Sequence, residues 1–196
     1  MIEFVLAVIF LLITPGPGVL TTAGIGAAYG FRAGLGFIVG LCIGGCLVMI
    51  AVITGVAAIV FTIPWLRTLL LIVSVSYLLF LAWRVATAGS RVGFINPGQP
   101  LGLWNGLALQ PINPKAYVVA STLFSGFPIF PEAILWETIL KLIVFNAIWF
   151  PIHLLWLWAG ARLHELNLPQ RTQRIINIGM ALAMVAVVAL ALTATL

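Results

Sequence analysis

Apolar runs of about 20 residues follow one another along the whole chain, and short segments that carry most of the charges separate them. An α-helix of that length crosses roughly 30 Å of hydrocarbon. Only 7% of the 196 residues are charged and 63% are hydrophobic, so too few charges exist to cover a water-soluble fold. The bilayer is therefore the expected solvent for most of the chain, and the expected fold is an all-α integral membrane protein.

Charges and turn residues divide the chain into about six predicted membrane-spanning helices. Nothing is left over for a soluble domain, so residues 1–196 are expected to form a single membrane domain. The first span follows Glu3 instead of basic residues and is longer than the apolar part of a signal peptide, so we expect it to be retained. The predicted spans are roughly 4–28, 36–60, 66–86, 103–125, 139–160 and 175–195.

Basic residues are unevenly distributed between the two sides of such a bundle. The termini, connection two and connection four carry only Arg67 and Lys141. Because cytoplasmic loops are enriched in Lys and Arg, both termini are predicted to be periplasmic. The net charge of +5 is therefore interpreted mostly as a topology signal, and no nucleic-acid partner is expected. Connections one, three and five carry Arg32, Arg84, Arg91, Arg162, Arg171 and Arg174.

Two proline clusters fall inside predicted spans and not between them. They are Thr14-Pro15-Gly16-Pro17-Gly18 and Gln110-Pro111-Ile112-Asn113-Pro114-Lys115. Each lies about 16 Å of helix from the start of its span, which is near the middle of the membrane. Proline lacks an N–H and frees the carbonyl four residues earlier, so the first and fourth helices are predicted to be broken there. In hydrocarbon, such a break must face protein or a wet cavity.

Each cluster also has the residues of a helix start, with Thr14 and Asn113 as N-cap residues before proline. The second half of each span would then point a partial positive charge at the midplane. Paired breaks in two halves indicate two inverted three-helix repeats with a substrate site between them. The first repeat would be about 1–87, the linker 88–100 and the second repeat about 101–196. Simple kinks in the two helices are the alternative.

Lys115 is the strongest candidate for a binding residue. A lysine near the middle of a span costs about 2.5–3.5 kcal/mol on insertion scales and needs a partner or a wet cavity. We expect its backbone N–H to be unpaired, so a substrate carboxylate would satisfy both the charge and this donor, while carbonyls released by the prolines would bind the α-amino group. The predicted substrate-binding residues are Thr14, Pro15, Gly16, Pro17, Gly18, Gln110, Asn113, Pro114 and Lys115.

Small residues recur every four positions in the second span, at Gly36, Gly40 and Gly44. Such a stripe lets helices pack closely in lipid, and helix packing is the preferred interpretation. A lining for the substrate route is the alternative, and a homodimer is compatible with the stripe. Cys42 and Cys46 share a face of the same span without His or carboxylate neighbours, so neither a metal nor a cofactor is expected.

Four groups of residues recur in one known family in the same order. They are Ile13-Thr14-Pro15-Gly16-Pro17, Gly30-Phe31-Arg32-Ala33-Gly34 followed by Gly40 and Gly44, Ser76-Tyr77-Leu78 with Arg84, and Asn113-Pro114-Lys115. With the length and the six-span pattern, they resemble the bacterial amino-acid exporters of the LysE/RhtB type. The resemblance implies efflux of an amino acid or a close derivative across the inner membrane, driven by the proton gradient.

The fifth span departs from the pattern of that family, in which many members carry an acidic residue. This chain has no Asp, and its four Glu residues flank the predicted spans. Asn146 and His153 are the coupling candidates in their place. Histidine, with an ordinary pKa near 6.5, could relay a proton, or could remain neutral and hydrogen-bonded between helices. Without an acid to pair a second positive charge, the substrate is predicted to have a neutral side chain.

Three other classes of protein fit the sequence less well. A divalent-metal exporter of related architecture needs Cys, His or carboxylate ligands that converge in the membrane. An enzyme needs a recognisable nucleophile or acid/base pair. A non-transporting structural protein does not explain helix breaks and a lysine at the midplane. We therefore expect a transporter and not an enzyme, with an amino acid and the lipid bilayer as its partners.

Overall fold

The computed structural model describes residues 1–14, 16–57, 62–87, 99–130, 132–166 and 169–193. Throughout these ranges the regular structure is helical, as predicted. The helices are α1 (Ile2–Ile13), α2 (Pro17–Tyr29), α3 (Phe31–Ile53), α5 (Pro64–Thr87), α6 (Leu103–Ile112), α7 (Pro114–Ser125), α8 (Ile134–Glu165) and α9 (Gln170–Thr193).

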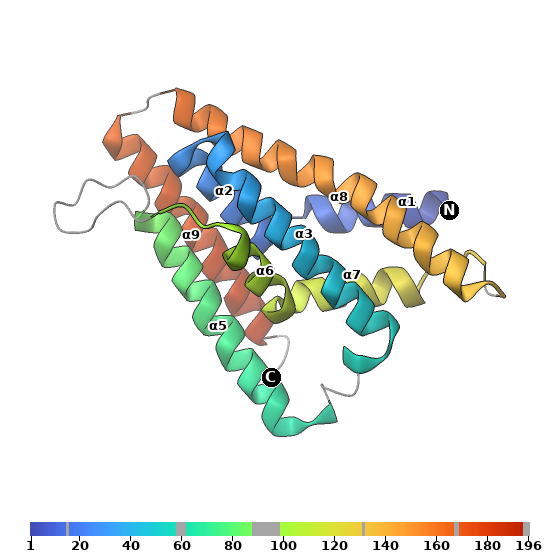
Figure 1. The fold of residues 1–196 in the computed structure, drawn as a ribbon. Helices are drawn as coiled ribbons and strands as arrows, with labels where there is room; N and C mark the ends of the chain where they lie inside the picture. Colours follow the sequence, from blue (N-terminus) through green and yellow to red (C-terminus); the bar gives the residue numbers. More distant parts are fainter. Residues whose placement is uncertain (15, 58–61, 88–98, 131, 167–168, 194–196) are drawn as a thin grey trace.

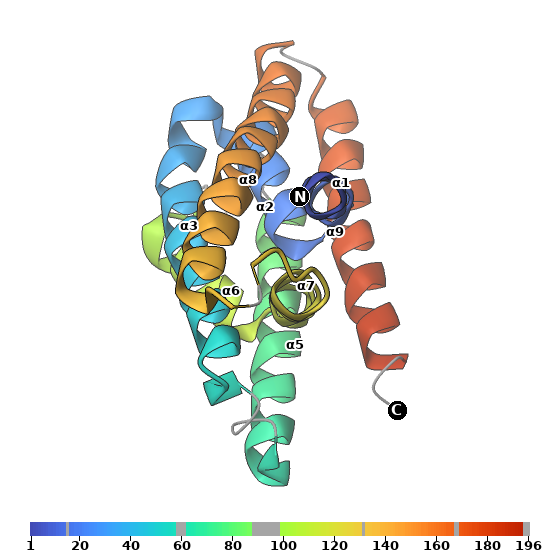
Figure 2. The ribbon, with the colours of Figure 1, turned by 90° about the vertical axis from the view of Figure 1, so that its right-hand side faces the viewer.

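The helices form an elongated bundle with two distinct ends (Figures 1 and 2). One end holds the C-terminal ends of α2, α5 and α8 and the starts of α3, α6 and α9, and the start of α1 lies towards the other end (Figure 1). Arg32, Arg84, Arg162 and Arg171 belong to terminal turns at the first end. The prediction that Lys141 lies in a connection is wrong, because this residue is inside α8 and only 1% exposed.

Two described helices are long and apolar enough to cross a membrane, namely α3 and the part of α8 from Ile134 to Leu163. α1 and α2 meet the same criteria as a pair bent by 54° at the first proline cluster. α6 and α7 form a second interrupted pair, with Asn113 between them. Broken helices are thus found at both clusters, while the number of six spans stays a prediction.

Glycines allow the close crossing of α3 and α6. A Cβ atom on Gly40 would lie 1.9 Å from the carbonyl oxygen of Leu103, and one on Gly106 would lie 2.1 Å from that of Phe37. No real Cβ approaches a backbone oxygen so closely, so only glycine fits at either position. Gly44 faces α6 in the same way, at 2.7 Å from the oxygen of Leu107. Gly40 and Gly44 of the stripe therefore pack against α6 of the same chain.

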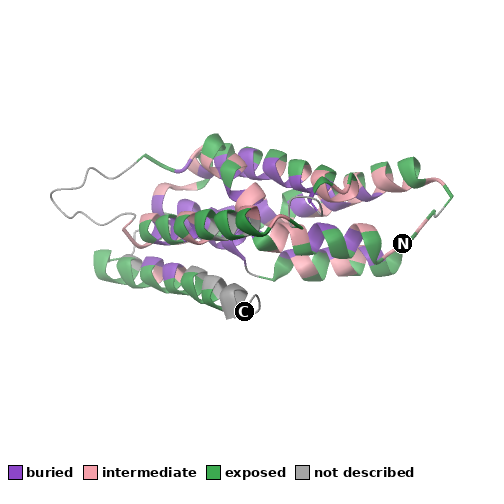
Figure 3. Ribbon diagram, turned by 90° about the horizontal axis from the view of Figure 1, so that it is seen from below, coloured by how far each residue is buried: buried purple, intermediate pink, exposed green. Residues whose placement is uncertain are grey.

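α2 lies at the centre of the bundle, where Figure 3 shows the buried residues gathered. Every residue from Pro17 to Ala28 is buried. Gly26 and Gly160 bring α2 against α8, because a Cβ on either would lie within 2.4 Å of a backbone oxygen of the other helix. Gly30, with φ of 82°, reverses the chain directly into α3. The start of α2 is thereby held inside the protein and not at its surface.

Candidate functional site

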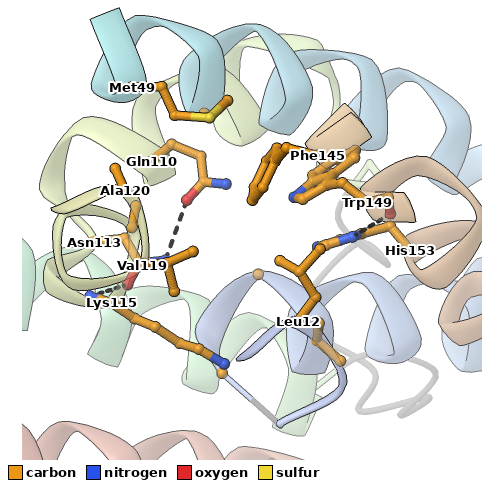
Figure 4. Close-up of a pocket in the computed structure, with 15 residues that line it drawn as sticks. Leu12, Met49, Gln110, Asn113, Lys115, Val119, Ala120, Phe145, Trp149 and His153 are labelled. Atoms are coloured by element: carbon orange, nitrogen blue, oxygen red, sulfur yellow. Dashed lines mark hydrogen bonds between the residues drawn. The ribbon is translucent and has the colours of Figure 1, made fainter. Parts of the chain in front are cut away.

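A cavity of about 60 Å³ lies where the two proline clusters meet (Figure 4). It has room for roughly four to six water molecules, which is the scale of a small solute. Among the predicted binding residues, Gly16, Gly18, Gln110, Asn113 and Lys115 line it. Pro17 and Pro114 adjoin these residues in the chain, Thr14 lies two residues before Gly16, and Pro15 lies outside the described residues.

Lys115 connects the second break to the first. Its Nζ donates a hydrogen bond to the carbonyl oxygen of Thr14, a residue 101 positions away in the sequence. Its aliphatic chain lies against Gly16, since a Cβ there would be 2.9 Å from Lys115 Cδ and 3.3 Å from Nζ. An ammonium group has three donors, and the carbonyl of Thr14 engages one of them. The positive charge therefore lies directly beside the start of α2.

The N-terminus of α2 is open to the same cavity. Gly16 is the N-cap residue and has no side chain, and Pro17 has no N–H, so the first amide donors are those of Gly18 and Val19. Both residues line the cavity, and the structure describes no side-chain hydrogen bond that caps this helix. The first amides of a helix have no acceptor within it, and its dipole is positive at this end. These donors and the Lys115 ammonium together suit an anion.

The prediction that Thr14 is an N-cap residue is wrong. Thr14 instead ends α1, where its Oγ1 donates to the carbonyl oxygen of Phe10 at 2.8 Å and its amide donates to the same oxygen at 3.3 Å. A threonine hydroxyl readily bonds the carbonyl four residues earlier. The second proline of the cluster, Pro17, therefore occupies the first helical position, where its missing N–H has no consequence.

Asn113 is the N-cap residue of α7, as predicted, and its Oδ1 accepts from the backbone N–H of Lys115 at 3.1 Å. The expectation that this N–H is unpaired is therefore wrong. Asn113 Nδ2 donates to Gln110 Oε1 at 3.2 Å, which leaves Gln110 Nε2 directed into the cavity (Figure 4). The carbonyl of Gln110 lies four residues before Pro114 and was therefore expected to be free, but it accepts from the amide of Asn113 at 3.0 Å.

An aromatic wall lies opposite Lys115 (Figure 4). Phe145, Trp149 and His153 form it, four residues apart on one face of α8. The His153 ring stacks on Trp149 with centroids 3.7 Å apart, and its Nδ1 lies 2.9 Å from the carbonyl oxygen of Trp149. Because a carbonyl can only accept, Nδ1 carries the proton and Nε2 of the neutral ring is an acceptor. The regular spacing of these residues is a signal that sequence reasoning could have used.

Asn146, the other coupling candidate, lies away from this wall. Its Oδ1 is 3.6 Å from the Sγ of Cys42 and 3.8 Å from that of Cys46. Its Nδ2 donates to the carbonyl oxygen of Leu142 at 2.8 Å. Asn146 therefore joins α8 to α3, and the structure brings only His153 of the two candidates to the cavity.

Broken apolar helices around an internal cavity, with the half-buried ammonium of Lys115 beside an open helix start, are typical of a helical membrane protein. The sequence matches the LysE type translocator family over residues 9–195, so the chain belongs to this family of transporters. The resemblance seen in the motifs is thereby confirmed.

Curated relatives give a more specific comparison. The cysteine/O-acetylserine efflux proteins of Salmonella typhi and Salmonella paratyphi A are each 32% identical over 116 residues, which cover 59% of this chain and 58% of the relative. The protein of that name from Escherichia coli strain K12 is 28% identical over 115 residues, with 58% of each chain covered. The match thus spans little more than half the length of these relatives. No solved structure matches the chain.

Proposed function

We propose that the protein exports a small amino acid with a neutral side chain, or a close derivative, from the bacterial cytoplasm. The position of Lys115 across Gly16, beside the amides of Gly18 and Val19, is the observation that carries this proposal. An ammonium group and a helix N-terminus at one point form a strong site for a carboxylate. Gln110 Nε2 is a further donor directed into the same cavity.

The α-ammonium group of such a substrate requires acceptors in the same cavity. The two acceptors we assign to it are Nε2 of His153 and the second lone pair of the Thr14 carbonyl, whose first lone pair accepts from Lys115 Nζ. Leu12, Met49 and Phe145 leave an apolar space of limited volume for the side chain. A small neutral side chain fits these conditions, and relatives named for cysteine and O-acetylserine efflux support this choice.

Two inverted three-helix repeats are the arrangement we propose for the transporter. α3 packs against both halves of the second broken helix, α6 and α7, and α8 packs against both halves of the first, α1 and α2. α5 and α9, the last helices of the two halves, pack against each other. A pseudo-twofold rotation that exchanges the two halves would exchange the contacts of α3 with those of α8 and would leave the contact between α5 and α9 in place. Both breaks then lie at the repeat interface, where inverted-repeat transporters bind substrate.

The proposal also covers the orientation of the protein in the membrane, the residue that couples export to protons, and the surface of a homodimer. The arginines gathered at one end of the bundle make that end cytoplasmic and place both termini in the periplasm. The proton gradient drives export, with His153 as the group that gains and loses the proton beside the substrate. A homodimer would use a surface other than Gly40 and Gly44, since α6 covers these residues.

Export by cells that produce variants of the full chain tests the site. Lys115→Gln should abolish export of L-cysteine while the amount of protein in the membrane stays nearly unchanged. Lys115→Arg should also impair export, because a planar guanidinium does not place its charge where a compact ammonium does. Arg162→Gln, a change at an exposed ion pair with Glu165, is the control and should have little effect. Normal export by Lys115→Gln would contradict the proposal.

A further inference from the structure

A second cavity, of about 530 Å³, is lined mainly by α3, α7 and α8, three of the helices that also line the first. On α3, α7 and α8, a residue that lines the second cavity lies one helical turn from a residue that lines the first: Ile53 from Met49, Phe124 from Ala120, and Lys141 from Phe145. In each case the step leads towards the end of the bundle where α3 and α7 end and α8 begins. The two cavities are therefore successive chambers between these helices, and the second lies on the side proposed to be periplasmic.

Glu137 and Lys141 supply charges to the second cavity. Lys141 Nζ lies 2.7 Å from Glu137 Oε1, and the two side chains are 1% and 13% exposed. The ammonium also donates to the carbonyl oxygen of Phe124 at 3.1 Å and lies 5.8 Å from the ring centroids of Phe4 and Phe124. Both charges are thus held together within largely apolar surroundings.

The stability of the fold does not account for this pair. An ion pair between residues four apart on one helix stabilises that helix only weakly, whereas removing a lysine from water is costly. Ionisable residues inside a membrane protein are therefore expected to serve the passage of a substrate or an ion. Glu137 Oε2 also accepts from the backbone amides of Ile129 and Phe130, which fixes the carboxylate in the first turn of α8.

We propose that Glu137 and Lys141 form a second zwitterion site, which the amino acid occupies after it leaves the Lys115 cavity. This inference rests on the export function proposed above. The ammonium of the amino acid pairs with Glu137 and its carboxylate pairs with Lys141, since the ligand and the site each carry two adjacent opposite charges. When the ligand departs, Glu137 and Lys141 pair with each other again. The ion pair between Glu137 and Lys141 thus competes with the ion pairs that each makes with the amino acid. Binding is weak as a result, which favours release.

The two faces of the membrane can be tested separately. Exchange of reduced L-cysteine is measured in right-side-out and everted vesicles from cells that produce the full chain. Glu137→Gln should raise the half-saturating concentration at the periplasmic face about tenfold, the effect of losing one charge-assisted contact. The value at the cytoplasmic face should change less than about twofold. Glu132→Gln, which removes an exposed carboxylate from the connection just before α8, is the control and should change neither value.

A second variant covers the case in which Glu137→Gln fails to fold. Thr138→Phe fills the second cavity without altering either charge and should give the same one-sided effect. The proposal of a second site would be overturned if the half-saturating concentration changed equally at both faces, changed at neither, or changed only at the cytoplasmic face. Failure of the wild-type protein to exchange L-cysteine at either face would instead contradict the proposed substrate class, and this inference with it.

Discussion

The side chain of Lys115 lies across Gly16, so that one residue of the second break covers one residue of the first at a distance that leaves no space for a Cβ. Gly16→Ala should therefore displace the ammonium from the start of α2 and reduce export at least about tenfold, while α2 itself stays folded. Export and membrane protein level in the same cells measure this. Gly179→Ala is the matched control, since a Cβ there meets nothing within 4 Å. Full export by Gly16→Ala would show that the position of Lys115 is not critical.

The glycine stripe of α3 should respond unevenly to substitution. Gly40→Ala places a methyl group against the oxygen of Leu103 and should destabilise the protein by about 1–3 kcal/mol, because neighbouring backbone cannot move aside cheaply. Gly36→Ala should be tolerated, since its Cβ would lie 3.7 Å from the nearest atom of α6. Thermal unfolding in detergent compares the two variants. Equal stability would mean that α3 and α6 are farther apart than described.

His153 should affect coupling more than binding. In His153→Asn, the amide can still donate to the carbonyl of Trp149 and its oxygen is still an acceptor, but the ring that we propose as the proton carrier is lost. Exchange of substrate between equal pools should therefore persist, whereas export driven by an imposed pH gradient should fall at least about tenfold. Proteoliposomes allow both measurements on one preparation. Gradient-driven export that survives the substitution would exclude His153 as the coupling group.

The distribution of arginines makes a prediction about topology. Reporter fusions at the C-terminus should be active only on the periplasmic side, and fusions between Arg84 and Pro100 only on the cytoplasmic side. A cytoplasmic C-terminus in a functional fusion would overturn the six-span map.

Much of this arrangement could be predicted from the sequence, because proline and membrane thickness act locally. The two breaks follow from the missing N–H of proline, and Lys115 stands out as a lysine near the middle of a predicted span. Which residue starts the second half of the first helix could not be decided in the same way. Thr14 and Gly16 each precede a proline, and the choice depends on Thr14 bonding the carbonyl of Phe10.

The remaining site residues depend on packing between distant segments. The hydrogen bond between Lys115 and Thr14 joins residues 101 positions apart in sequence, so it depends on the meeting of the two breaks, which no local pattern predicts. The position of Lys141 was harder to predict, since a lysine close to the edge of a span is commonly a topology signal. Its i, i+4 spacing from Glu137 was the local indication that the two side chains pair within α8.

Recognition of the carboxylate by Lys115 is the central claim, and substrates with and without that group test it most directly. Proteoliposomes that contain the purified protein are loaded at neutral pH with either L-cysteine or cysteamine, its decarboxylated analogue, and protein-free liposomes correct for leakage. The wild-type protein should export L-cysteine at least about tenfold faster than cysteamine, and Lys115→Gln should lose this preference. Export of cysteamine by the wild-type protein as fast as L-cysteine would show that Lys115 does not bind a carboxylate.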